Sequence, residues 1–185
     1  MNQSHIWKQL KFVTGNPNKL REAREILGID LEQVAADHLH EIQTSDIRQL
    51  VEHKATAAWE ELRCPVLVED SGLIFTAWNG LPGAFVKWFE KSVGCEGMLK
   101  MLEPFENRRA EAVCLVAVFD GKTLIVGEGR VSGTIAPGLR GSQGFGWDVL
   151  FIPEGETRTY AEMTPEEKNS ISHRRQAFES LKSQL

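Results

Sequence analysis

Two adjacent carboxylates, Glu69 and Asp70, follow the apolar residues 66–68 and precede Ser71-Gly72. A short apolar run that ends at a glycine breaker predicts a buried strand with this pair at its carboxyl end. Ligands of open α/β sheets bind at the carboxyl ends of strands, and a carboxylate there suits Mg²⁺, a hard cation that prefers oxygen. Because side chains alternate between the two faces of a strand, one carboxylate is expected to face a site and the other to face away. The alternative interpretation is a solvated strand end without chemistry.

A second candidate site is the turn at residues 14–19, Thr-Gly-Asn-Pro-Asn-Lys, between an expected strand and a helix. Asn16 is a typical N-cap residue, Pro17 suits the first helical position, and Gly28 closes the helix. Exposed backbone N–H groups and the helix dipole make such a turn a binding site for anions, and Lys19 adds a positive charge. The glycine-rich Walker A pattern is absent, and the alternative is a turn without a ligand.

Lys54 lies on the apolar side of a long helix that the sequence predicts from its expected N-cap, Ser45, to Leu62. It follows Ile47 by seven residues, which is two helical turns, and so shares a face with the apolar stripe. A buried ammonium needs an anionic partner. In the alternative interpretation the alkyl stem is buried while the charged end reaches water.

Two aromatic residues, Phe145 and Trp147, alternate with glycine where the glycine-rich stretch 133–146 ends. A ring exposed in such a loop can stack on a flat ligand such as a nucleobase, an interaction worth roughly 1–3 kcal/mol per base. Alternatively, both rings fold back onto the core.

Three basic residues, Lys168, His173 and Arg174, lie close to two candidate helix starts. Thr164 begins a capping box with proline at the first helical position, and Ser172 is a second candidate N-cap, so one helix or two can follow. Cations near a helix N-terminus oppose the helix dipole, which an anionic ligand would offset. An exposed basic patch is the alternative.

The elements that must position these residues alternate between strands and helices. Asp120-Gly121 is a hairpin turn dipeptide between two apolar runs, 110–119 and 123–131. No linker or change of composition divides the chain, so residues 1–185 are expected to form one domain. The other expected elements are strands at 10–14, 31–36, 66–68, 73–75 and 149–152 and short helices at 84–91 and 96–102.

Composition narrows the class of protein. The 185 residues carry a net charge of −5, with 42% hydrophobic and 25% charged residues, as in ordinary globular proteins. The net charge argues against nucleic-acid binding, and no apolar run is long enough to predict a membrane span. The cysteines, Cys64, Cys95 and Cys114, lack the spacing of a disulfide framework or a zinc site. A reducing, cytoplasmic location is therefore expected.

Six segments together carry a family resemblance: Phe12–Leu20, Val68–Leu73, Leu81–Phe89, Gly144–Asp148, Tyr160–Met163 and Glu167–Arg174. In these segments, which occur in the family's order and span nearly the whole chain, the sequence resembles the Ham1/inosine triphosphate pyrophosphatase family. Its Lys-Trp-Phe at 87–89 is closer to archaeal and eukaryotic members than to typical bacterial ones. Val149 and Ala84 stand where many or some members have proline, which affects loop rigidity and leaves the chemistry intact.

The resemblance implies an elongated α/β fold, in which a mixed β-sheet is flanked by helices and two lobes enclose a central active-site cleft. It also implies a homodimer. The implied activity is hydrolysis of non-canonical purine nucleoside triphosphates (ITP, dITP and XTP) to the monophosphate and pyrophosphate. Mg²⁺ would be the cofactor, and cleansing of the nucleotide pool the role.

By the same resemblance, Asp70 is the catalytic residue that activates water, and Glu41 and Asp70 hold Mg²⁺. Phe145 stacks on the base, and Arg174, which can only donate, suits the 6-oxo oxygen of inosine and xanthine. The substrate-binding residues that the resemblance implies are Thr14, Gly15, Asn16, Asn18, Lys19, Lys54, Ser71, Lys87, Phe145, Gly146, Trp147, Asp148, Lys168, His173 and Arg174.

Two other functions stay open on the sequence. One is a purine-nucleotide-binding regulator with reduced catalysis, which would keep Phe145 and the basic helix but lack a metal-binding carboxylate. The presence of both Asp70 and Glu41 favours the enzyme. The other is a pyrimidine triphosphate pyrophosphatase, such as a dUTPase. GTP shares the 6-oxo group of ITP, and the sequence assigns no residue that rejects it.

Overall fold

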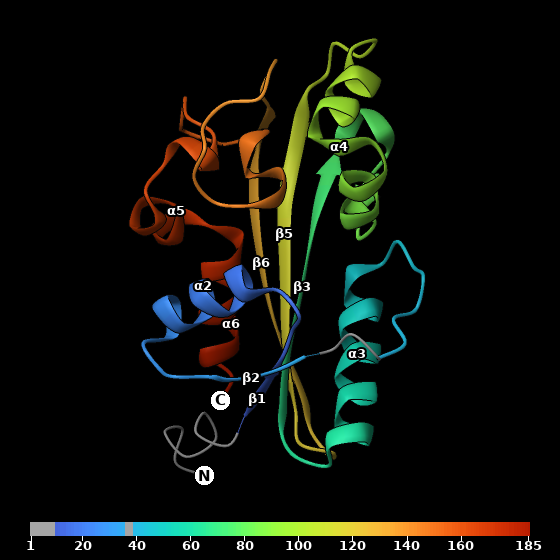
Figure 1. The fold of residues 1–185 in the computed structure, drawn as a ribbon, viewed down its shortest axis with the longest axis vertical. Coiled ribbons are helices and arrows are strands. Elements are labelled where there is room, and N and C mark those ends of the chain that lie inside the picture. The colour runs from blue at the N-terminus through green and yellow to red at the C-terminus, as the bar shows by residue number, and fades with distance from the viewer. Residues whose placement is uncertain (1–9, 36–38) are drawn as a thin grey trace.

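The computed structural model describes residues 10–35 and 39–185, and within them one seven-stranded sheet runs the length of the molecule (Figure 1). The strand order is β2-β1-β3-β5-β6-β7, with the short β4 paired to β3. β1 is parallel to both of its neighbours and the other pairs are antiparallel, so the sheet is mixed, as expected. The strands are β1 (Lys11–Val13), β2 (Glu32–Val34), β3 (Val66–Phe75), β4 (Pro82–Gly83), β5 (Arg109–Phe119), β6 (Leu124–Ile135) and β7 (Phe151–Pro153).

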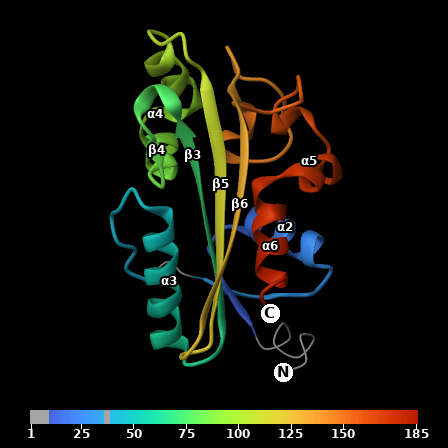
Figure 2. The ribbon, with the colours of Figure 1, turned by 180° about the vertical axis from the view of Figure 1, so that it is seen from behind.

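Helices cover both faces of this sheet (Figure 1, Figure 2). On one face, α4 (Val86–Leu102) lies beyond the end of α3 (Ile47–Leu62) along the long axis. On the other face lie α2 (Pro17–Leu27), α5 (Pro165–Ile171) and α6 (His173–Lys182). The long strands β3, β5 and β6 connect a lower lobe, which contains α2, α3 and α6, to an upper lobe that contains α4. The expected elongated α/β fold with two lobes is confirmed.

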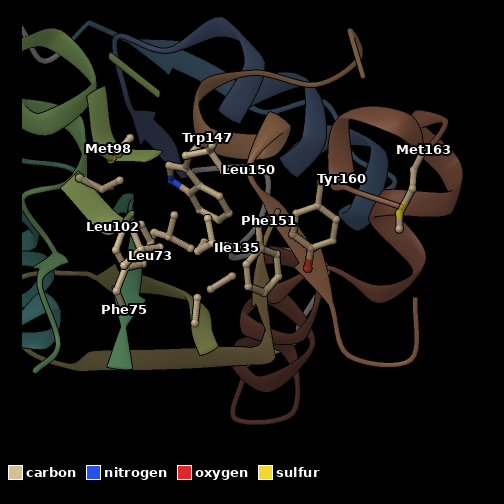
Figure 3. Packing of buried hydrophobic residues seen from close by; sticks show 13 residues of the cluster. Leu73, Phe75, Met98, Leu102, Ile135, Trp147, Leu150, Phe151, Tyr160 and Met163 are labelled. Atoms are coloured by element: carbon tan, nitrogen blue, oxygen red, sulfur yellow. The ribbon is translucent and has the colours of Figure 1, made fainter. Parts of the chain in front are cut away.

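Three apolar clusters fill the lobes. In the lower lobe, one cluster includes Phe12 and Phe178 and another includes Val51 and Val68. Residues 69–72 of β3 belong to none of the three clusters, so the central strand has a polar middle between two apolar ends. The upper cluster includes Leu73, Phe75, Met98, Leu102, Ile135, Trp147, Leu150, Phe151, Tyr160 and Met163 (Figure 3).

The central strand does not end at the carboxylate pair, so the expected turn at Ser71-Gly72 and the expected new strand at 73–75 are wrong. β3 is continuous because its ladder with β5 includes all ten of its residues. Gly72 serves close packing instead of a turn. A Cβ at this position would lie 2.5 Å from Cδ1 of Ile47 and 2.8 Å from the carbonyl oxygen of Gly83.

Three other boundaries differ from those expected. Asp46, not Ser45, caps α3, because its side chain accepts hydrogen bonds from two backbone N–H groups of the first turn. β6 extends to Ile135, into the glycine-rich stretch, because its last residues pair with β7. The strand expected at 149–152 begins at Phe151, after a 3-10 helix, η2 (Gly146–Val149).

The other expected elements are present. Asn16 and Gly28 cap α2, and the capping box at Thr164 starts α5. Ser172 caps α6, which settles the open question in favour of two helices. The two helices expected at 84–91 and 96–102 form α4, with a kink at Gly94. The strand expected at 31–36 is β2 at 32–34, and residue 36 lies outside the described residues.

Candidate functional site

A cleft with two connected chambers lies where the polar middle of β3 meets the surrounding helices. The aromatic chamber has a volume of about 290 Å³ and is defined by Phe145, Trp147, Asp148, His173 and Arg174, with Asn18, Ser71 and Gly146 also in its wall. The lysine chamber, about 640 Å³, is defined by Thr14, Gly15, Glu41, Lys54 and Lys91. Four residues line both chambers and form their junction: Asn16, Lys19, Asp70 and Lys87.

The cleft therefore brings together every site residue that the sequence predicted except one. Lys168 lines neither chamber; it is buried, with its ammonium 4.7 Å from the centroid of the Phe145 ring.

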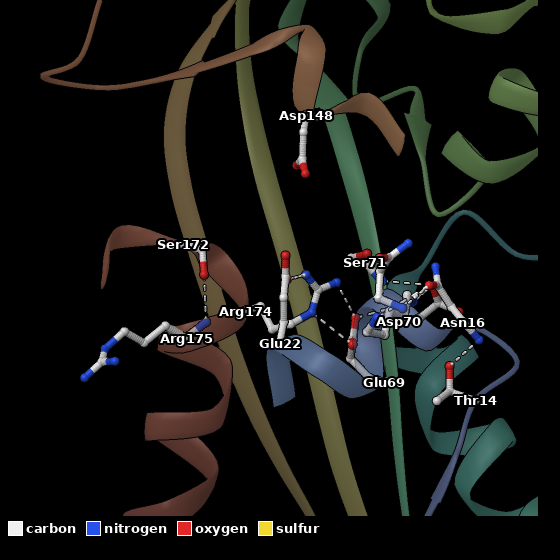
Figure 4. Close-up of polar contacts among 12 residues, drawn as sticks. Thr14, Asn16, Glu22, Glu69, Asp70, Ser71, Asp148, Ser172, Arg174 and Arg175 are labelled. Carbon is white, nitrogen blue, oxygen red and sulfur yellow. Dashed lines mark hydrogen bonds and ion pairs between the residues drawn. The ribbon is translucent and has the colours of Figure 1, made fainter. Parts of the chain in front are cut away.

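The turn at residues 14–19 forms as expected, but its backbone N–H groups are largely occupied. Oδ1 of Asn16 accepts from the N–H groups of Asn18 (2.9 Å) and Lys19 (3.4 Å), and the Thr14 hydroxyl accepts from the Asn16 N–H (3.1 Å) (Figure 4). Pro17 has no N–H. The expectation of a cradle of exposed amides is corrected, because the turn's own side chains satisfy the N–H groups of Asn16, Asn18 and Lys19. What the turn offers an anion is the Lys19 ammonium and the helix dipole.

The two adjacent carboxylates divide as the alternation of side chains predicts. Asp70 lines both chambers, whereas Glu69 is 1% exposed and accepts two hydrogen bonds of 3.0 Å from the Arg174 guanidinium (Figure 4). Lys19 lies near both, with Nζ 3.4 Å from Glu69 and 3.6 Å from Asp70. Burial alone would raise the pKa of Asp70, but Lys19 and Lys54 together hold it below its ordinary value. Asp70 is therefore ionised at neutral pH.

Lys54 is buried on α3 and has its anionic partners within the chain. Its Nζ donates to Oε1 of Glu41 at 2.8 Å and lies 3.6 Å from Oδ2 of Asp70. The snorkelling alternative is thus excluded. Because Glu41 and Asp70 reach the same ammonium, their carboxylates lie close together in the wall of the lysine chamber.

These two carboxylates fit a magnesium ion. Mg²⁺ is usually held by one or two carboxylates together with waters and substrate phosphates. In the described residues no group of three or more acidic, histidine or cysteine side chains forms a denser cage. The residues therefore suit an ion that arrives with a phosphate ligand better than a permanently bound structural metal.

A buried ion-pair network lies behind the aromatic chamber. Arg174 of α6 joins Glu69 of β3 to Glu22 of α2, and Lys168 of α5 joins Glu22 (2.8 Å) to Asp148 (2.6 Å). Both cations are almost fully buried. The sequence predicted either an anionic ligand or an exposed basic patch beside these helix starts. Neither expectation holds for Lys168 and Arg174, because the chain's own carboxylates neutralise the two cations.

Glu22 is a member of this network that sequence reasoning missed. In the sequence Glu22 is one of several charged residues of its helix, and only the structure shows that it is 2% exposed beside Ala23 of the buried stripe. Burial alone would raise its pKa, but Arg174 and Lys168 hold the pKa of its carboxyl below the ordinary value. Its partner Arg174 is 152 residues away, so no local pattern reveals the pairing.

The two aromatic residues of the loop, Phe145 and Trp147, differ in burial. Trp147 is 6% exposed and packs against Phe151 and His173, with ring centroids 5.9 and 5.3 Å apart. Phe145 remains half-buried in the chamber wall, with the Lys168 ammonium and the Arg174 guanidinium against its ring. Each alternative interpretation therefore holds for one ring, and Phe145 is the one placed to stack on a ligand.

Local backbone geometry fixes Phe145 in this wall. Asp148 accepts a hydrogen bond from the Phe145 N–H at 2.8 Å, which closes the loop into η2. A Cβ on Gly144 would lie 2.2 Å from the same Asp148 oxygen, and Gly144 has a φ of +71°. Only glycine fits there.

His173 offers unused polar atoms to the aromatic chamber. It is 1% exposed, and neither ring nitrogen has a hydrogen-bond partner in the part of the chain that the structure describes. Burial and the neighbouring Arg174 and Lys168 lower its pKa well below the ordinary value, so the imidazole is neutral. A neutral imidazole has one donor and one acceptor, which suits the edge of a heterocycle.

Glu90, on α4, is a second residue that sequence reasoning missed. It lines the aromatic chamber, and a Cβ on Gly146 would lie 3.0 Å from its Oε1. Burial, followed by the nearby Asp148, raises the pKa of its carboxyl to about 7. In the sequence it is one charge among several on the helix, and nothing local distinguishes it.

The fold places the protein in the α/β class known from solved Ham1 structures. A Ham1 protein from Coxiella burnetii superposes with a TM-score of 0.80 at 31% identity, covering 94% of this chain and 97% of that one. The chain belongs to the Ham1 family, whose sequence profile matches residues 10–184.

Two relatives illustrate the sequence similarity. The inosine triphosphate pyrophosphatase of Schizosaccharomyces pombe is 45% identical over 172 residues, which cover 91% of this chain and 90% of that protein. The dITP/XTP pyrophosphatase of Thermococcus kodakarensis is 43% identical over 173 residues, 92% of this chain and 93% of that protein. Within the described ranges, no helix combines the length and apolarity that a membrane crossing requires.

Proposed function

We propose that this protein hydrolyses non-canonical purine nucleoside triphosphates, ITP, dITP and XTP, to the monophosphate and pyrophosphate, and thereby cleanses the nucleotide pool. The relatives named for inosine triphosphate and for dITP and XTP support this activity. The observation that carries it is the position of Asp70, an ionised carboxylate at the junction between a lysine-rich and an aromatic chamber. That junction is where the α-phosphate of a nucleotide would lie if its base and its terminal phosphates occupied opposite chambers.

The lysine chamber would hold the phosphates. Lys19, Lys54 and Lys87 line it, from α2, α3 and α4 respectively. In phosphoryl transfer, positioning and neutralisation of the charge that develops on the phosphate oxygens supply most of the catalysis. Lysines that come from three helices can surround a triphosphate. Lys87, at the junction, can neutralise the negative charge that develops on the departing pyrophosphate.

Asp70 would orient and deprotonate the attacking water, which displaces pyrophosphate in line from the α-phosphorus without a covalent intermediate. Asp70 and Glu41 would also hold Mg²⁺. When bound, the ion would supply Lewis-acid stabilisation of charge on the phosphate oxygens. The ammonium of Lys54, between the two carboxylates, would hold both side chains in place when no cation is near.

The aromatic chamber would hold the purine. Phe145 would stack on the base, while the neutral His173 and the donors of Arg174 lie on the same wall. The Nε and both Nη atoms of Arg174 already donate to Glu69 and Glu22. Each Nη keeps one further N–H, which would donate to the 6-oxo oxygen alongside the network.

A pyrophosphate-release assay over ITP, dITP, XTP, ATP, GTP and dUTP tests the proposal. Release from the first three in preference to ATP and dUTP is the expected result. Preference for dUTP would indicate a pyrimidine enzyme, and binding of ITP without turnover at saturating Mg²⁺ would indicate a regulator. Chelation of Mg²⁺ with EDTA is expected to abolish turnover, and added Mg²⁺ to restore it.

We also propose that the protein acts in the cytoplasm as a homodimer. The resemblance to the family suggests the dimer, and the three free cysteines agree with a reducing, cytoplasmic location. Light scattering of the purified protein at micromolar concentration tests the dimer, which predicts a mass twice that of the 20.8 kDa chain.

A further inference from the structure

Glu90 is an acidic residue in the cleft to which neither the catalytic nor the metal-binding role applies. Its carboxyl makes no hydrogen bond or ion pair with residues 10–35 or 39–185, although it is only partly exposed. The other carboxylates of the aromatic chamber are occupied: Asp148 binds Lys168, and Asp70 lies beside Lys19. A partly buried carboxyl that faces a ligand cavity without a partner is available to accept from the ligand.

The location of Glu90 within the cleft identifies the part of a nucleotide that it faces. Lys87 lies at the junction of the two chambers, and Glu90 follows it by three residues on the same face of α4, about 4.5 Å further along the helix axis. Glu90 lines only the aromatic chamber, and its Oε1 approaches Gly146, the residue after Phe145. It therefore lies between the phosphate-binding junction and the ring that stacks on the base.

In a nucleoside triphosphate, the sugar is what lies between the α-phosphate and the base. Its hydroxyl groups are neutral donors, and a carboxylate is the acceptor that dinucleotide-binding folds use for a ribose hydroxyl. A phosphate would be repelled by Glu90, and the base is already flanked by Phe145, His173 and Arg174. The sugar is the only remaining part with donors.

We propose that Glu90 is a sugar-binding residue, whose carboxylate accepts a hydrogen bond from a ribose hydroxyl of the substrate. This inference rests on the proposed function, since it takes the ligand to be a purine nucleotide with its phosphates in the lysine chamber. It assigns to α4 a second role beside that of Lys87: one helical turn contributes the phosphate contact and the next contributes the sugar contact.

At a pH above the Glu90 pKa of about 7, where its carboxyl is ionised, the test compares ITP with 2′,3′-dideoxyinosine triphosphate, which lacks both hydroxyls, in the wild type and in Glu90→Ala and Glu90→Gln. A hydrogen bond to a charged acceptor is worth about 10- to 100-fold in affinity. We expect Glu90→Ala to lower kcat/KM for ITP by about that factor, mainly through KM, and the loss to disappear with the dideoxy substrate. Glu90→Gln, whose amide oxygen still accepts, should lose less.

Glu96→Ala is the matched control, because Glu96 is an exposed glutamate on the same helix outside both chambers. This variant should change kcat/KM for neither substrate. dITP and 3′-deoxy-ITP then show which hydroxyl is bound, and a selective effect on either supports the proposal. Equal losses for ITP and the dideoxy substrate, or no loss for either, would overturn it.

Titration with inosine monophosphate and its dideoxy analogue separates this proposal from the proposed function. The titration measures the sugar contact without turnover. Glu90→Ala should weaken the binding of inosine monophosphate and leave the binding of its dideoxy analogue unchanged. A wild type that binds the monophosphate but releases no pyrophosphate from ITP contradicts the proposed activity alone. An active wild type whose monophosphate binding is insensitive to Glu90 contradicts the sugar contact alone.

Discussion

At the scale of single residues, Asp70 is the group on which the proposed chemistry depends. Two lysines keep it ionised, and its side chain is 20% exposed to the cleft, so exchanging one oxygen for an amide nitrogen disturbs little packing. We expect Asp70→Asn to fold normally and to lower kcat by on the order of 10²–10⁴, the usual effect of removing a general base. Pyrophosphate release at saturating Mg²⁺ measures it.

Asp30→Asn is the control for this substitution, because the Asp30 side chain is 90% exposed and pairs only with Arg24 among the described residues. Its kcat should equal that of the wild type. A nearly normal kcat for Asp70→Asn would remove Asp70 from the catalytic role.

The sequence predicted the residues that line the cleft better than it predicted the bounds of the helices and strands. The ordered motifs placed the residues of the turn at 14–19, Lys54, Asp70 and Phe145 in one cleft, and the structure brings them there. Glu22 and Glu90 were missed because their significance comes from what they face on distant elements: buried cations for Glu22 and a ligand chamber for Glu90. A glutamate on an amphipathic helix has the same local pattern whether it faces water, a buried arginine or a ligand cavity.

At the scale of elements, Gly72 determines how closely α3 and β4 approach the middle of β3. A Cβ there would overlap both Ile47 of α3 and the backbone of Gly83, and backbone cannot move aside cheaply. We expect Gly72→Ala to lower the free energy of unfolding by about 1–3 kcal/mol, the usual cost of overpacking. Gly138→Ala, with open space around the added methyl, should cost much less. Urea unfolding of the two variants measures the difference, and equal stabilities would contradict the packing role.

The continuity of β3 shows why elements were less predictable than residues. Glu-Asp-Ser-Gly inside an apolar sequence has the local signature of a strand end followed by a turn. The partners that keep it extended are Val113–Val116 of β5, more than forty residues later. Long-range pairing overrides the local signal, and the polar segment becomes the floor of the cleft.

Arg174 is the contact through which α6 is fixed to both β3 and α2. Removing one partner from a buried ion pair typically costs about 3–5 kcal/mol, because the carboxylates left behind are buried without compensation. We expect Arg174→Ala to lose about that much stability, measured by urea unfolding. Arg175→Ala on the next residue, which is partly exposed and pairs with Glu179, should lose less than about 1 kcal/mol. Equal losses would show that the network contributes little.

This structural role changes how base selection must be tested. A loss of ITP hydrolysis in Arg174→Ala does not isolate a contact with the 6-oxo group, because the substitution also disturbs the network. The informative quantity is the ratio of kcat/KM for ITP to that for ATP, since a general loss of structure lowers both. A narrowed ratio supports the contact, and an unchanged ratio places Arg174 in the network alone.

At the scale of the whole molecule, one buried ion-pair network connects segments from the beginning, middle and end of the chain. Through Glu22, Glu69, Asp148, Lys168 and Arg174 it joins α2, β3, η2, α5 and α6 beside the cleft. The family resemblance predicted the two lobes and the central cleft, but no local pattern predicts charges that meet across so many elements. The cleft is thus bounded by groups whose ionisation is tied to folding.

The ionisation of these buried groups predicts how the free energy of unfolding depends on pH. Burial alone would raise the pKa values of Glu22, Glu69 and Asp70, but neighbouring Arg174, Lys168, Lys19 and Lys54 hold all three below their ordinary values. A carboxyl with a lowered folded pKa stabilises the protein above its unfolded pKa, about 4.5 for Glu and 3.8 for Asp, and that stability is lost as the pH falls further.

His173 acts in the same direction from a higher pH. Its folded pKa is well below the ordinary 6.5, so below pH 6.5 the unfolded state binds a proton that the folded state does not. Glu90 opposes it, because a folded pKa of about 7 means that the folded state gains a proton first as the pH falls from 7 toward 4.5. The two contributions offset one another in that interval, which leaves the three buried carboxylates to dominate below it.

We therefore expect the free energy of unfolding to change little between pH 7 and 5 and to fall steeply below pH 4.5. Each carboxyl that is protonated only on unfolding adds up to about 1.4 kcal/mol per pH unit to the slope. Urea unfolding at half-unit intervals from pH 7 to pH 3 measures it. In Glu90→Gln, the term that opposes His173 is absent, so its stability should already decline between pH 6.5 and 5 while the steep fall below pH 4.5 is retained. A wild-type stability that is constant down to pH 3 would contradict the lowered pKa values, because Glu22, Glu69 and Asp70 would then titrate alike in the folded and unfolded chains.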